Sequence, residues 1–109
     1  MIFPRVRAIA QGTVLPPNYT VKGISRDGSA LVYRIPNNRG GKPYQKNIPA
    51  PEWEVAYQRL VGSGEFTRTW FKRNLPCAKN GGCNFTLIGE VFVLLELADR
   101  QPAKYVLQP

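Results

Sequence analysis

Basic side chains are the groups in this sequence whose chemistry is easiest to interpret, because they outnumber the acids. The chain of 109 residues has 15 lysines and arginines, seven aspartates and glutamates and no histidine, which gives a net charge of +8. The excess lies in residues 1–50, which hold eight bases and one acid. A positive field of this kind attracts polyanions, nucleic acid above all, and it also suits an acidic protein partner.

Two stretches of the chain combine bases with other groups that suit a nucleic acid. Residues 36–50 form a long connection with three prolines, two glycines and three bases. Residues 65–74 are expected to form a helix whose bases lie off its apolar stripe. Ammonium and guanidinium groups neutralise phosphates, and a tyrosine ring stacks on an unpaired base. The predicted nucleic-acid-binding residues are Arg5, Arg7, Arg34, Arg39, Lys42, Tyr44, Lys46, Arg68, Lys72 and Arg73.

Catalytic and metal-binding chemistry have little support in the residue types. A chain without histidine has no histidine base or ligand, and Cys77 and Cys83 supply only two of the four ligands of a structural zinc site. We therefore expect no metal, no cofactor and no enzymatic activity. Free thiols are the preferred interpretation of the two cysteines, with a disulfide or a redox pair as the alternative.

A β-hairpin is the clearest of the elements that must position these side chains. Residues 19–25 and 30–35 are rich in strand-forming residues, and the Asp27-Gly28 pair between them suits a type I′ turn. With these two residues as the loop, Lys22 faces Tyr33 across the hairpin.

Residues 51–74 are expected to form two helices joined by the turn Gly62-Ser63-Gly64. The apolar residues of the first helix follow helical spacing and form one buried stripe, which comprises Trp53, Ala56, Tyr57 and Leu60. Two short helices around a glycine-containing turn resemble a helix-turn-helix. On this interpretation the second helix, over residues 65–74, lies against nucleic acid.

A third helix is expected over residues 85–98, and apolar side chains from Leu87 to Ala98 cover most of its circumference. Such a helix lies either in the centre of a core or in the interface of a homodimer, and both alternatives stay open. No apolar run reaches about 18 residues, so no membrane-spanning helix is expected. The first residues lack the apolar segment of a signal peptide, which favours a cytoplasmic protein.

These elements predict an α+β fold in a single domain over residues 1–109. A β-rich part over residues 1–35, with a short strand at residues 5–10 beside the hairpin, precedes the basic connection over residues 36–50. The helical part over residues 51–109 ends in a short strand at residues 104–107. The predicted arrangement is similar to a winged helix in which the hairpin comes before the three helices.

One stretch of the chain resembles an enzyme family. The segment Leu31-Val32-Tyr33-Arg34-Ile35-Pro36-Asn37, followed by Gly41-Lys42-Pro43-Tyr44, is similar to the opening hairpin of the GIY-YIG nucleases. The resemblance implies that Tyr33 and Tyr44 act as acid and base. It also implies that Arg59 stabilises charge and that Glu90 binds a metal ion.

The sequence as a whole predicts a small, non-enzymatic nucleic-acid-binding protein, with DNA preferred over RNA as the polymer. The expected mechanism is electrostatic capture by the basic first half and residues 36–50, with the helix over residues 65–74 as a second contact. The alternatives are a protein-interaction module or a homodimer formed through the third helix, and a nuclease of the GIY-YIG type.

Overall fold

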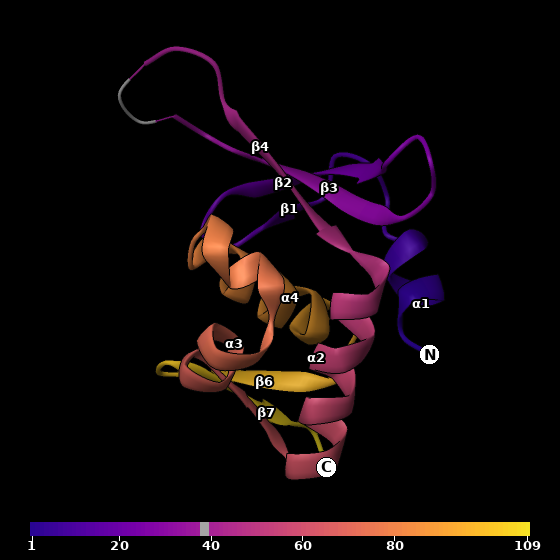
Figure 1. Ribbon diagram of the computed structural model, residues 1–109, viewed down its shortest axis with the longest axis vertical. Helices are drawn as coiled ribbons and strands as arrows, with labels where there is room; N and C mark the ends of the chain where they lie inside the picture. Colours follow the sequence, from indigo (N-terminus) through magenta and orange to yellow (C-terminus); the bar gives the residue numbers. More distant parts are fainter. Residues whose placement is uncertain (38–39) are drawn as a thin grey trace.

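Two antiparallel sheets with helices between them make up the computed structural model, which describes residues 1–37 and 40–109 (Figure 1). The first sheet has the order β1-β2-β3-β4, with strands over Val14–Leu15, Tyr19–Ile24, Ala30–Ile35 and Tyr44–Pro49. The second sheet has the order β5-β7-β6, with strands over Glu65–Thr67, Lys104–Leu107 and Ala98–Gln101. The helices are α1 (Phe3–Arg7), α2 (Ala50–Ser63), α3 (Arg68–Asn74) and α4 (Cys83–Leu94), with the 3-10 helix η1 (Pro76–Asn80) before α4.

The predicted α+β class is confirmed, but the order of the elements differs from the predicted winged-helix-like arrangement. A helix comes first, and a second antiparallel sheet is completed at the end of the chain. The expected closing strand is present as β7, and it pairs with β5 on one side and β6 on the other. One cluster of buried side chains, including Leu31, Trp53 and Tyr105, extends from the first sheet through the helices to the second.

The predicted strand at residues 5–10 is wrong, because this part of the chain forms helix α1. A proline in the first turn suits a helix start, where its missing N–H group has no partner to lose. The carboxylate of Glu54 in α2 caps the N-terminal end of α1. It accepts hydrogen bonds from the backbone N–H groups of Ile2 and Phe3, each at 2.9 Å. The acceptor comes from a distant part of the chain, so no local pattern reveals it.

The hairpin of β2 and β3 is confirmed, and its predicted register holds next to the loop, where Ile24 pairs with Leu31, but not at Tyr33. Tyr33 faces Val21 rather than Lys22, because a β-bulge between Val21 and Gly23 shifts the pairing by one residue. Gly23 has a φ of +115°, a conformation that residues with a side chain rarely adopt. The bulge puts Val21 in the core beside Tyr33 and leaves Lys22 partly exposed.

The turn of this hairpin is not the predicted type I′ turn, which requires a positive φ at both central residues. Of the pair Asp27 and Gly28, only Gly28 has a positive φ, of +77°. The Asp27 carboxylate instead accepts hydrogen bonds from the hydroxyl groups of Ser25 and Ser29 and from the Ser29 N–H group. The two serines thus organise a longer loop around the carboxylate.

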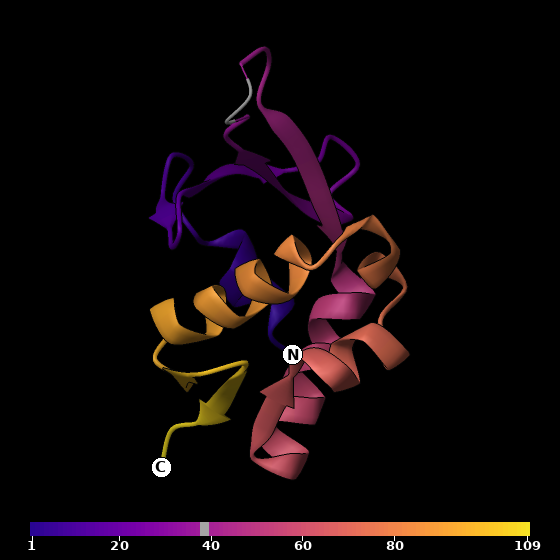
Figure 2. The ribbon, with the colours of Figure 1, turned by 90° about the vertical axis from the view of Figure 1, so that its left-hand side faces the viewer.

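Residues 36–50 are not one long connection as predicted, because their second half is strand β4. This strand pairs with β3 along its whole length. Ile48 is completely buried, and the indole N–H group of Trp53 donates to the Ile48 carbonyl at 3.1 Å. These contacts hold the base of the β3–β4 arm, which consists of β3, β4 and the described residues between them (36–37 and 40–43), against α2. The far end of the arm projects beyond the helices (Figures 1 and 2).

The predicted helix-turn-helix pair is wrong, because strand β5 separates the two helices. Helix α2 has the predicted buried stripe and continues to Ser63, after which Gly64 ends it with a φ of +82°. The next three residues pair with β7 and bury Phe66. Thr67 caps α3 by accepting a hydrogen bond from the Trp70 N–H group, so the second helix begins at Arg68.

The third predicted helix is α4, which ends at Leu94 rather than at residue 98 because Ala98 begins strand β6. The apolar side chains of α4 are buried within the single chain; those with no exposed area are Leu87, Ile88, Val91 and Phe92. Of the two alternatives for this helix, the structure therefore shows the one in which it lies in the core.

Candidate nucleic-acid interface

Most of the basic side chains have no acid beside them. Among the residues that the structure describes, only Arg100 and Lys104 form ion pairs, with Glu90 and Glu65. The two glutamates of α2 accept hydrogen bonds from backbone N–H groups instead. The positive charge is therefore left available to attract anions.

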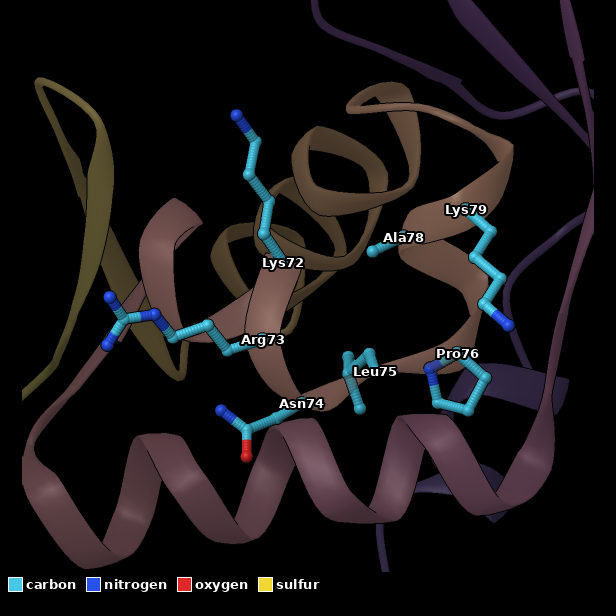
Figure 3. Close-up of a pocket in the computed structure, with 7 residues that line it drawn as sticks. All are labelled: Lys72, Arg73, Asn74, Leu75, Pro76, Ala78 and Lys79. Atoms are coloured by element: carbon cyan, nitrogen blue, oxygen red, sulfur yellow. The ribbon is translucent and has the colours of Figure 1, made fainter.

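A pocket between the end of α3 and η1 is bordered by three of these bases. Its volume is about 510 Å³, and it is lined by Lys72, Arg73, Asn74, Leu75, Pro76, Ala78 and Lys79. Figure 3 shows the three basic side chains leaving the backbone in different directions, while Asn74 and Leu75 point toward α2. None of these seven lining residues is acidic. Lysine and arginine in such a position suit the phosphate groups of a nucleic acid.

A second pocket, of about 340 Å³, is lined by Gln45, Lys46, Asn47 and Asn80. The ammonium group of Lys46 donates a hydrogen bond to the backbone carbonyl of Asn80, so β4 contacts the end of η1. Asn80 directly follows Lys79, which lines the first pocket. We call the four residues Lys46, Lys72, Arg73 and Lys79 the basic surface.

Arg68 lies beside this surface and is partly buried. Its guanidinium carbon is 4.8 Å from the centroid of the Phe85 ring, which is a cation–π contact. A Cβ atom at Gly82 would lie 2.5 Å from Nη1 of Arg68, and one at Gly81 would lie 3.2 Å from Nζ of Lys46. Two bases therefore flank the diglycine turn. Within the described part of the chain, the Arg68 guanidinium has no hydrogen-bond or ion-pair partner.

The remaining predicted binding residues lie elsewhere. Arg5 and Arg7 are on α1, which lies away from α3 in Figure 1, and both donate to backbone carbonyls. Three more of them lie on the β3–β4 arm and are exposed, namely Arg34, Lys42 and Tyr44. Arg39 falls outside the residues that the structure describes. The structure thus brings Lys46 to the end of η1, where it contacts Asn80, and it places Lys72 and Arg73 around a pocket with Lys79.

Three of the four residues implied by the nuclease resemblance are engaged within the chain. Tyr33 is fully buried and its hydroxyl donates to the side-chain carbonyl of Asn84, and burial raises the pKa of Tyr33 far above its ordinary value. Glu90 is 3% exposed and accepts hydrogen bonds from an arginine and a tyrosine of the second sheet. Arg59 lies over an indole ring of α3. Tyr44 is exposed.

Sequence reasoning missed Lys79, which lines the first pocket, and Asn80, which lines the second. They lie between Cys77 and Cys83 in a stretch of asparagine and glycine with a base, a composition like that of residues 36–50. This composition is the feature of the sequence that could have identified Lys79 and Asn80 as candidate binding residues. The cysteines themselves are free thiols, and burial raises the pKa of Cys77 above its ordinary value.

The chain matches no known protein-family model, and neither a curated protein nor a solved structure is significantly similar to it. In the part of the chain that the structure describes, no helix combines the length and the apolar character needed to cross a lipid bilayer. The function must therefore be inferred from the side chains of this protein.

Proposed function

We propose that this protein binds nucleic acid, without catalysing a reaction on it, through the basic surface and the β3–β4 arm. The observation that carries the proposal is the pocket bordered by Lys72, Arg73 and Lys79, which has no acidic lining residue. DNA is the polymer that we expect, and RNA is tested beside it.

The proposed mechanism is neutralisation of phosphates by exposed bases, with release of the counterions that surround the polymer. Lys72 and Arg73 are exposed at the end of α3, and Lys79 is exposed on η1. The first residues of α3 are less available, since Thr67 is used as a cap and Arg68 is partly buried. Contact with phosphates rather than with base edges is therefore the expected role of α3.

Fluorescence anisotropy with labelled duplex DNA and with RNA, at several salt concentrations, tests the proposal. If about five phosphates are neutralised on duplex DNA, the logarithm of the association constant should fall with the logarithm of salt with a slope near −4.5. Changing Lys72, Arg73 and Lys79 together to alanine should make this slope shallower by about 2.7, or about 0.9 per lost phosphate contact.

A matched control removes the same charge from another part of the molecule. Arg5, Arg7 and Arg26 are exposed residues of α1 and the β2–β3 loop, so their joint change to alanine should alter the slope less than the first variant does. Equal effects of the two variants would mean that bases all over the molecule contribute equally to binding. That result would contradict the assignment of binding to Lys72, Arg73 and Lys79. Absence of salt-dependent binding to both polymers at micromolar protein would overturn the proposed function.

A further inference from the structure

Tyr44 is an exposed aromatic residue beside the basic surface. Side chains alternate between the two faces of a strand, so Tyr44, Lys46 and Ile48 share one face of β4. Ile48 is completely buried in the core, and Lys46 reaches the carbonyl of Asn80. Tyr44 lies two residues farther out along the same face and is 58% exposed. Its ring therefore lies past the edge of the core, on the face from which Lys46 contacts η1.

The polar and basic groups near Tyr44 suit the base edges and the phosphates of a nucleotide. Three of the four residues that line the second pocket carry a carboxamide, namely Gln45, Asn47 and Asn80. These side chains make no hydrogen bond to the described part of the chain and are exposed. A carboxamide can donate to and accept from the edge of a base. Lys46 lines this pocket, and Lys79 directly precedes Asn80 in the chain, so both can supply positive charge for adjoining phosphates.

We propose that the preferred ligand is a single strand of nucleic acid, with an unpaired base stacked on the Tyr44 ring and the adjoining phosphates bound by Lys46 and Lys79. The inference rests on the proposed function and names the form of the polymer. In a duplex both faces of each base are covered by its neighbours, so an aromatic ring on a strand has no base face to contact. In a single strand the base faces are free, and aromatic stacking adds about 1–3 kcal/mol per base.

Anisotropy titrations of an oligothymidylate of about 16 nucleotides, the matching oligouridylate and a DNA duplex of the same length test this inference at one salt concentration. We expect a single strand to bind more tightly than the duplex, and the two single strands separate DNA from RNA. Tyr44→Ala should weaken binding of the single strand by about 5-fold to 150-fold, and should weaken duplex binding less. Tyr44→Phe keeps the ring without the hydroxyl group and should bind like the parent protein.

The outcomes separate the two proposals. Tighter binding of the duplex, or single-strand binding that Tyr44→Ala does not change, would overturn the stacking inference and leave the proposed function in place. Failure of all three polymers to bind would overturn both. Because Tyr44 is exposed, its replacement should leave the unfolding midpoint unchanged, and a circular dichroism melt of each variant checks this.

Discussion

At the scale of single residues, Gly89 of α4 packs directly against the ring of Tyr105 in β7. A Cβ atom at Gly89 would lie 1.9 Å from Cε2 of that ring. The ring is itself held, because its hydroxyl donates to the carboxylate of Glu90 at 2.9 Å. Glycine is therefore required at this position by the second sheet, although α4 by itself would be more stable with alanine.

Gly89→Ala should lower the free energy of unfolding by about 3 kcal/mol or more, because neither the ring nor the helix can move without breaking other contacts. Gly62→Ala is the matched control, since a Cβ atom at Gly62 meets nothing within 4 Å and the residue lies in α2. This second change should raise stability by up to about 1 kcal/mol through helix propensity. Urea unfolding measures both, and a stable Gly89→Ala variant would contradict the described packing of β7 on α4.

At the scale of elements, the loop between β2 and β3 depends on one ionised group. The hydrogen bonds from Ser29 and Ser25 to the Asp27 carboxylate lower the pKa of Asp27 from its ordinary value of 3.8 to about 2. A carboxyl group whose pKa is lower in the folded protein than in the unfolded chain stabilises the folded state. The stabilisation is complete at any pH above the pKa that the group has in the unfolded chain. This stabilisation is lost as the pH falls toward and below the pKa that Asp27 has in the folded protein.

Replacement of Asp27 by asparagine should therefore destabilise the protein above about pH 4 and make little difference below about pH 2. The stability difference between parent and variant should shrink across this window. Urea unfolding of both proteins between pH 6 and 2 measures it, with salt held constant. A difference that does not change with pH would show that the charge of Asp27 does not act on the loop.

Whether the sequence could predict an element depended on where that element finds its partners. The stripe with Trp53 and Leu60 is a property of one helix, and the hairpin of β2 and β3 joins neighbouring segments, so both were predictable from local pattern. Strand β5 was not, because it pairs with β7 from the end of the chain. The bulge at Gly23 was also missed, since the residue order allows either register and burial of Val21 selects one.

At the scale of the whole molecule, the apolar surface of α4 is covered by other parts of the same chain. Four of its side chains have no exposed area, whereas Leu94 at its end is 46% exposed. A homodimer formed along this helix would need the helix to leave the core. Burial within one chain therefore argues against the predicted alternative of a homodimer through the buried face of this helix.

We expect light scattering to give a molar mass near 12.2 kDa that does not rise with protein concentration. Leu94→Lys removes the exposed apolar end of α4 and should leave this mass unchanged. A mass that doubles with concentration, and returns to the monomer value in Leu94→Lys, would favour the protein-interaction alternative over a monomer.

Residue types and local spacing by themselves determined the excess of positive charge, the α+β class, the β2–β3 hairpin and the buried face of α2. These features depend on composition or on neighbours within a few residues. Only the tertiary structure decided that β4 and β5 are strands and that Lys46 contacts Asn80 at the end of η1. The physical reason is that a strand is stabilised by its partner, and a surface of several bases exists only where separate segments are packed together.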